Sequence, residues 1–167
     1  MPSVLKGKRV LVVDDEPDVC EMVRDELMDC EVEVAGSFEQ ARRKLERGGY
    51  DVVILDIMGV SGYELLEGYA EKFPCIMLTA NALGVEHLRR SMAGKARLYL
   101  PKEELGRLEE YVAKVLAEPR PLWRWLLAKL DFRRWLGEDL ARLEPELFRD
   151  LDLSPARLER DLRSDAG

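Results

Sequence analysis

Asp51-Val52-Val53-Ile54-Leu55-Asp56 is the stretch that decides the fold. Four consecutive apolar residues, three of them β-branched, lie here between a turn-forming pair, Tyr50-Asp51, and a carboxylate. A run of this kind predicts a strand of a parallel sheet that is buried on both faces. Such a strand places its last residue, Asp56, at the carboxyl edge of the sheet, where open α/β folds bind ligands.

A second strand of the same design lies earlier in the chain. The strand predicted over 9–13 carries an apolar run at 10–13, which is followed directly by Asp14 and Asp15. Because the carboxyl ends of parallel strands meet at one edge of a sheet, we expect these two carboxylates to lie near Asp56. We interpret the rest of the chain as the scaffold that positions these three carboxylates.

Strand and helix patterns alternate along the rest of the first 118 residues. The alternating stretch 31–35 is typical of an edge strand with one solvated face, and Ser37 is suited to cap the helix after it. Five strand-helix repeats with short turns predict an α/β fold, with a parallel sheet that helices cover on both faces. Further strands are expected over 74–79 and 96–100, and helices over about 17–29, 38–47, 63–72, 84–93 and 103–117.

Composition divides the chain into two parts. Residues 1–118 hold 16 Lys and Arg against 23 Asp and Glu, whereas residues 119–167 hold 10 of each. The net charge of −7 argues against a protein whose whole surface attracts a phosphate backbone. Glu118-Pro119-Arg120-Pro121 should end the last helix of the first part, so we place the domain boundary there.

The second part, 119–167, predicts a small C-terminal α-helical extension. All three tryptophans of the protein fall within residues 123–135, and a segment of this size is too short to build a generous core alone. A helix that docks on a protein or forms a homodimer is the leading interpretation. DNA binding, RNA contact and a membrane-surface helix are the weaker alternatives, because the segment is neutral and its basic face is thin.

Cysteine and histidine usage excludes several classes of site. Cys20, Cys30 and Cys75 are odd in number and contain no C-x-x-C pair, so we interpret them as small buried residues in a reducing compartment. His87, the only histidine, is expected to be solvated on the fourth helix, and it offers neither a triad nor a zinc site. The N-terminal apolar run is too short for a secretory signal or a membrane span, so we expect a cytoplasmic protein.

Four strand-end motifs together resemble the CheY-like receiver domain of two-component response regulators, over residues 6–118. The resemblance implies the flavodoxin-like (βα)5 fold with strand order 2-1-3-4-5, for which CheY itself is a standard example. Each motif alone is weak, but all four occur in order at strand ends. They are Val12-Val13-Asp14-Asp15-Glu16-Pro17, Ile54-Leu55-Asp56, Met77-Leu78-Thr79-Ala80 and Tyr99-Leu100-Pro101-Lys102.

The resemblance implies that Asp56 accepts a phosphoryl group from a phosphohistidine on a sensor histidine kinase or a phosphotransfer protein. It also implies that Mg²⁺ is held by Asp14, Asp15, Asp56 and the backbone carbonyl of Met58. Such a hard cation takes oxygen ligands and neutralises charge during phosphoryl transfer. Without the metal, the clustered carboxylates should repel one another, and the pKa of at least one should rise.

The remaining roles fall at the ends of two other strands. The resemblance implies that Lys102 supplies a positive charge and Thr79 a hydroxyl for the phosphoryl oxygens, with Ala80 leaving room beside it. Tyr99 matches the aromatic residue that changes rotamer on phosphorylation. Each of these residues also has a plain structural interpretation, such as core packing for Tyr99 or a solvated helix start for Lys102.

Two features depart from the family pattern. The loop after Asp56, over 57–62, is about two residues shorter than usual. Pro101 precedes Lys102 instead of following it, so the usual cis-proline after the lysine is absent. Both departures bear on how long the phosphoryl group persists.

We therefore expect a response regulator, not an enzyme, that switches its interactions with an unknown downstream protein. The first rival is a haloacid-dehalogenase-like phosphatase, but that family has Asp-x-Asp after its first strand where this chain has Asp14-Asp15-Glu16. The second rival is a pseudo-receiver that binds a partner without phosphorylation. The complete set of three aspartates, Thr79 and Lys102 argues against it.

Overall fold

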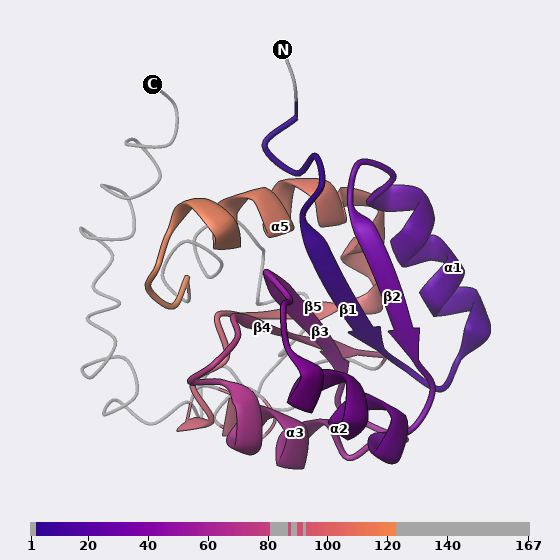
Figure 1. Ribbon diagram of the computed structural model, residues 1–167, viewed down its shortest axis with the longest axis vertical. Helices are drawn as coiled ribbons and strands as arrows, with labels where there is room; N and C mark the ends of the chain where they lie inside the picture. Colours follow the sequence, from indigo (N-terminus) through magenta and orange to yellow (C-terminus); the bar gives the residue numbers. More distant parts are fainter. Residues whose placement is uncertain (1–2, 81–86, 88–89, 92, 123–167) are drawn as a thin grey trace, which may run out of the picture.

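The computed structural model describes residues 3–80, 87, 90, 91 and 93–122. The helices are α1 (Pro17–Glu26), α2 (Phe38–Arg47), α3 (Gly62–Tyr69), the 3-10 helix η1 (Lys102–Arg107) and α5 (Leu108–Ala117) (Figure 1). The strands are β1 (Arg9–Val13), β2 (Glu31–Ala35), β3 (Val52–Asp56), β4 (Cys75–Thr79) and β5 (Leu98–Pro101).

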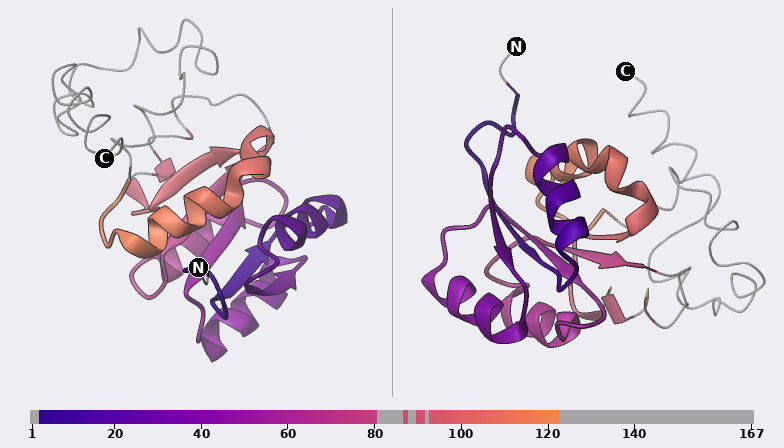
Figure 2. Two further views of the ribbon diagram at one scale, coloured as in Figure 1. Left: turned by 90° about the horizontal axis from the view of Figure 1, so that it is seen from above. Right: turned by 90° about the vertical axis from the view of Figure 1, so that its right-hand side faces the viewer.

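One parallel sheet, in the order β2-β1-β3-β4-β5, forms the middle of the described chain. This confirms the predicted fold class and strand order. Helices α1 and α5 cover one face of the sheet, and α2 and α3 cover the other (Figures 1 and 2). The register pairs Val13 with Leu55, so the residues that follow β1 lie beside the end of β3.

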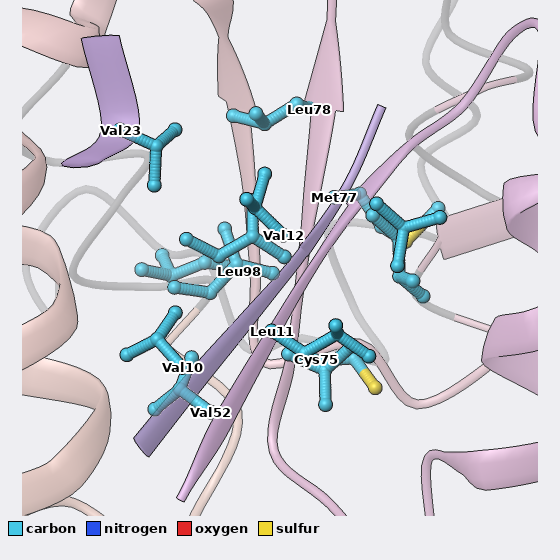
Figure 3. Close-up of a cluster of buried hydrophobic side chains, with 14 of the residues drawn as sticks. Val10, Leu11, Val12, Val23, Val52, Cys75, Met77, Leu78 and Leu98 are labelled. Carbon is cyan, nitrogen blue, oxygen red and sulfur yellow. The ribbon is translucent and has the colours of Figure 1, made fainter. Parts of the chain in front are cut away.

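The core lies between the sheet and these two helix layers. Every residue of β3 and β4 is buried, as a strand covered on both faces requires. The side chains of Leu11, Val12 and Met77 lie in the cluster that Figure 3 shows. In contrast, β2 is half-exposed over most of its length, which confirms the prediction of an edge strand.

Local chemistry accounts for where the helices begin. Ser37 caps α2 by accepting a hydrogen bond from the backbone N–H of Gln40 at 3.3 Å, as predicted. Pro17 takes the first turn of α1, where its missing N–H leaves no helical bond unmade. Gly48, at a φ of 73°, ends α2 in a conformation that favours glycine.

Three helices differ from their predicted bounds. Helix α1 ends at Glu26 and α3 at Tyr69, each about one turn early, and the chain then turns toward the next strand. The expected helix 103–117 begins as η1 and becomes α-helical only at Leu108. Since side chains three residues apart align in a 3-10 helix, Leu105 and Leu108 can both enter the core directly after β5.

The expected helix 84–93 lies largely outside the described residues. Its described positions, 87, 90, 91 and 93, are helical. No helix of the described residues is long and apolar enough to cross a membrane. Of the cysteines, Cys20 and Cys75 are buried and Cys30 is half-buried, and all three are free thiols.

The last described residues return to the sheet after α5. Helix α5 ends at Ala117, before the two prolines, as predicted. The backbone N–H of Leu122 donates to the carbonyl of Arg97 at 3.0 Å, and the Arg97 guanidinium donates to the carbonyl of Glu118 at 3.0 Å. Leu122 is buried against the core, whereas the extension predicted after it lies outside the described residues.

An ionic cluster centred on Glu33 lies at the β2 edge of the sheet. The Glu33 carboxylate accepts from the Arg9 guanidinium at 2.8 Å, the Tyr50 hydroxyl at 2.7 Å and the Lys44 ammonium at 3.2 Å. The Tyr50 hydroxyl, followed by Arg9 and Lys44, lowers the pKa of Glu33 to about 2. These bonds join β1, β2, α2 and the start of β3, so the cluster fixes the edge strand in register.

We predict that Glu33→Gln lowers the free energy of unfolding at pH 7 by ~0.5–1 kcal/mol, the range for half-exposed charged hydrogen bonds. The folded-state pKa of Glu33 lies below its ordinary value of 4.5, so the stabilisation is complete above pH 4.5. It is lost as the pH falls through about 2. Urea unfolding at several pH values measures the difference.

Glu46→Gln is the matched control, because Glu46 pairs only with the exposed Arg42 among the described residues. It should change the free energy of unfolding by much less. Equal effects of the two variants at pH 7 would contradict a stabilising role for the cluster.

Candidate functional site

The ends of β1 and β3 bring two carboxylates together at the carboxyl edge of the sheet. Asp56 is the last residue of β3, and Asp14 directly follows β1. Both are nearly fully buried, with 1% of Asp14 and 3% of Asp56 exposed. Asp15 is exposed beside them, so the three predicted carboxylates lie at one edge, as the strand ends require.

Lys102 follows the edge strand β5 and places a positive charge beside these carboxylates. Its ammonium lies 2.9 Å from Asp14 Oδ2, 3.0 Å from Glu16 Oε1 and 3.4 Å from Asp56 Oδ1. Lys102 follows β5 directly and is itself mostly buried. A buried carboxylate needs a charge partner, and Lys102 is the partner that Asp14 and Asp56 share.

Burial and like charges dominate the electrostatics of Asp56. Desolvation, with the charges of Asp14 and Asp15, raises the pKa of Asp56 to about 6 although Lys102 opposes the rise. This is the direction expected for clustered carboxylates. Burial acts to lower the pKa of Lys102, but its close pairing with Asp14 and Glu16 outweighs burial and raises that pKa. Above pH 6, Asp56 therefore carries its negative charge in a buried position, 3.4 Å from the Lys102 ammonium.

The loop after β3 closes over the acidic edge. Gly59 has a φ of 84°, and a Cβ there would lie 2.7 Å from Asp15 Oδ2. A Cβ at Gly62 would fall on the carbonyl oxygen of Asp56. Glycine lets the loop pass close to the Asp15 carboxylate at position 59 and to the backbone of Asp56 at position 62. Met58 lies in this loop with 64% of its surface exposed, and the role of its carbonyl stays a prediction.

Thr79 and Tyr99 extend the site along β4 and β5. Thr79 ends β4 and pairs with Pro101 in the register, which places it beside Lys102 in the sheet. Tyr99 is fully buried, and burial raises the pKa of its hydroxyl, as does the neighbouring Tyr63. The Thr79 side chain opposes this and lowers the pKa of Tyr99. The Tyr99 hydroxyl nevertheless makes no full hydrogen bond among the described residues.

His87 lies at a helical position, as predicted, but it is half-buried and paired with Tyr63 instead of simply solvated. His87 Nδ1 lies 2.9 Å from the Tyr63 hydroxyl, which also donates to the His87 carbonyl at 3.1 Å. The two rings are parallel within 6°, and the Arg90 guanidinium lies 4.2 Å from the centre of the Tyr63 ring. Together they line a hollow of about 260 Å³ beside the loop after β3. Helical periodicity could not indicate this contact, because Tyr63 comes from α3.

Glu16 is the site residue that the sequence interpretation missed. One carboxylate oxygen each from Asp14, Asp15 and Glu16 lie within 4.8 Å of one another, and Glu16 also pairs with Lys102. The sequence did offer an indication, because Glu16 continues the acidic run and is not a favoured N-cap residue for α1. Hard oxygen donors this close together suit a divalent cation such as Mg²⁺, and the predicted ligand Asp56 is not a member of this group of three.

Comparisons with known proteins agree with the fold and the site. The family model of the response regulator receiver domain matches residues 10–113. The chain is 28% identical to the response regulator protein PilR of Pseudomonas aeruginosa, over 83% of this chain and 34% of that protein. It is 36% identical to the transcriptional regulatory protein TrcR of Mycobacterium tuberculosis, over 64% of this chain and 43% of that protein. The chain thus matches less than half the length of either relative.

Solved structures of response regulators are also similar to this chain. The response regulator TrrA from Thermotoga maritima, determined in complex with Mg²⁺ and BeF, has a TM-score of 0.57 and 38% identity. The match covers 65% of this chain and 99% of TrrA. A putative response regulator from Chloroflexus aurantiacus has a TM-score of 0.61 and 29% identity, over 68% of this chain and 100% of its own.

We predict that Asp56→Asn raises the free energy of unfolding at pH 7.5 by ~1–3 kcal/mol when a chelator removes divalent metals. The folded-state pKa of Asp56, about 6, exceeds its ordinary value of 3.8, so ionised Asp56 destabilises the fold above pH 6. The penalty disappears below pH 3.8. Urea unfolding at pH 7.5 and pH 4 should therefore show a large difference that shrinks on acidification.

Asp25→Asn, on the exposed part of α1, removes the same charge without burial and is the control. Its effect should be small at both pH values. A loss of stability at pH 7.5 in Asp56→Asn would contradict the argument, because it would mean that ionised Asp56 stabilises the fold.

Proposed function

Since this chain belongs to the family of response regulator receiver domains, we propose that Asp56 accepts a phosphoryl group from a phosphohistidine on a sensor histidine kinase or a phosphotransfer protein. The observation that supports this most directly is the shared ammonium of Lys102, 3.4 Å from a buried carboxylate whose pKa is raised to about 6. A carboxylate of this basicity is ionised at neutral pH and remains a good nucleophile.

The transfer is a displacement at phosphorus. An oxygen of Asp56 forms the new bond to phosphorus as the bond to the histidine nitrogen breaks, and the freed imidazole nitrogen takes up a proton. The chain's own contribution is to orient the Asp56 carboxylate at the end of β3 and to hold a positive charge beside it. Positioning and electrostatics are the main requirements of phosphoryl transfer.

We further propose that Asp14, Asp15 and Asp56, with the carbonyl of Met58, hold Mg²⁺ at the acidic edge. The donors are all oxygens, and the short loop around Gly59 passes close to Asp15. The cation would neutralise the charge of the phosphoryl oxygens while these residues orient it. The second glycine, Gly62, keeps the start of α3 close to Asp56.

The proposed switch involves Thr79, Lys102 and Tyr99. A phosphoryl group adds about −1.5 to −2 charges at Asp56, to which the Lys102 ammonium and the Thr79 hydroxyl can respond. If the Thr79 hydroxyl donates to a phosphoryl oxygen, it moves away from the Tyr99 hydroxyl, which is buried beside it. The loss of this neighbour favours a different position of the Tyr99 side chain. The conformation of β5 then depends on whether Asp56 is phosphorylated.

The domain division and the partners form part of the same proposal. Residues 1–118 act as the receiver, a signalling module rather than an enzyme, in the cytoplasm. Residues 119–167 form a helical extension that contacts a downstream protein or a second copy of the chain. The neutral charge of this extension gives no support to a nucleic-acid partner.

Incubation with acetyl phosphate and Mg²⁺ should add one phosphoryl group to the native chain, because a small phosphodonor needs only the acceptor site. Asp56→Asn should not be labelled, and a chelator should prevent labelling of the native protein. Intact-mass spectrometry measures the addition, with Asp51→Asn as the control for a neighbouring strand-boundary aspartate. Labelling that persists in Asp56→Asn would show that the acceptor is another residue.

Lys102→Ala should still be labelled, though more slowly, but should not switch, because the charge that responds to the phosphoryl group is gone. Fluorotyrosine incorporation followed by ¹⁹F NMR measures the response, with Tyr99→Phe identifying the Tyr99 resonance. We expect beryllofluoride to shift this resonance in the native protein and to leave it in place in Lys102→Ala.

Lys95→Ala removes an exposed lysine that pairs with Glu71, and it should respond like the native protein. An unchanged beryllofluoride response in Lys102→Ala would show that coupling to Tyr99 does not pass through Lys102.

A further inference from the structure

Glu16 occupies a capping position without capping the helix. It is the N-cap residue of α1, yet its side chain makes no hydrogen bond to the first turn. Asp, Asn, Ser and Thr are the residues that suit this position, because a longer side chain reaches the free N–H groups poorly. The Glu16 carboxylate lies instead 3.0 Å from the ammonium of Lys102, 86 residues further along the chain.

The two carboxylates that contact Lys102 most closely differ in their freedom to move. Asp14 is held at both oxygens, because Oδ1 accepts the backbone N–H of Glu16 at 2.9 Å and Oδ2 pairs with Lys102. Among the described residues, the Glu16 carboxylate is held in the site by Lys102, and 58% of the Glu16 side chain is exposed. Of the two carboxylates, Glu16 can therefore separate from Lys102 without leaving a buried carboxylate unpaired.

Lys102 is not yet in close contact with the proposed acceptor. Its ammonium lies nearer to Asp14 and Glu16, at 2.9 and 3.0 Å, than to Asp56, at 3.4 Å. An ammonium that moves toward a phosphoryl group on Asp56 must weaken at least one of its other contacts. The half-exposed contact to Glu16 is the one that costs least to break.

We propose that Glu16 is a positioning residue that holds Lys102 in the resting state and competes with the phosphoryl group for its ammonium. The proposal rests on the phosphorylation of Asp56 proposed above and deepens it. Glu16 thereby weakens the pairing of Lys102 with the phosphoryl group and favours the resting arrangement. The length and charge of residue 16 then set how readily the switch responds.

The test measures the affinity of the full chain for beryllofluoride, a phosphoryl analogue, in the presence of Mg²⁺. Glu16→Gln should bind about two- to fivefold more tightly than the native protein, the range for loss of a half-exposed ion pair. Glu16→Asp should also bind more tightly, since the shorter side chain keeps the charge but is suited to capping α1 instead of reaching Lys102. Isothermal titration calorimetry gives the dissociation constants.

Two controls separate positioning from a general effect of charge. Glu103→Gln removes an exposed carboxylate directly after Lys102 and should bind beryllofluoride like the native protein. In a Lys102→Gln background, Glu16→Gln should change the affinity by less than about 1.5-fold, because its partner is gone. Native affinity in both Glu16 variants, or an equal gain with and without Lys102, would overturn the proposal.

A second measurement does not depend on phosphorylation. Urea unfolding of the native protein, Glu16→Gln, Lys102→Gln and the double variant, in chelator, should show that the two substitutions are not additive. Additive effects would mean that Glu16 does not hold Lys102 in the resting state. If the native protein binds no beryllofluoride, the proposed function fails, whereas this cycle still decides whether Glu16 positions Lys102.

Discussion

One ammonium among three carboxylates is the interaction on which the rest of this structure depends. Asp14 and Asp56 are buried at neighbouring strand ends, and their charges are tolerable only because Lys102 lies between them and Glu16. A parallel sheet is what makes this possible, since it brings the ends of β1, β3 and β5 to one edge. The strands that carry these residues are buried in the core, and the glycines of the loop after β3 let the chain pass close to the edge.

Hydrophobic periodicity was sufficient to predict the sheet. Buried strands such as β3 differ in pattern from the half-exposed β2, and the resemblance to CheY-like receivers supplied the strand order that the structure confirms. Helix ends were less predictable, because they depend on how soon the chain must reach the next strand. The segment after β5 shows this best, since it begins as a 3-10 helix in which Leu105 is already buried in the core. The family match over residues 10–113 favours neither the phosphatase nor the phosphorylation-independent interpretation.

Positions at strand ends were predictable, but contacts between distant side chains were not. Asp14, Asp56 and Lys102 follow from where strands end, and the structure brings them together. The pairing of Glu16 with Lys102 joins residues 86 positions apart, and that of Tyr63 with His87 joins residues 24 apart. No local pattern specifies such pairs, because they depend on how α1 and α3 sit on the sheet. The roles of Met58, Thr79 and Tyr99 in switching remain predictions.

The hydrogen bonds by which the chain returns to β5 after α5 join the end of the described residues directly to the start of that strand. Leu122 is bonded to Arg97, which lies two residues before Tyr99 in the sequence. If Asp56 is phosphorylated as proposed, any partner whose affinity depends on that phosphorylation must shift the phosphorylation equilibrium by the same factor. Coupling of this kind would act in both directions, because linkage between two equilibria is reciprocal.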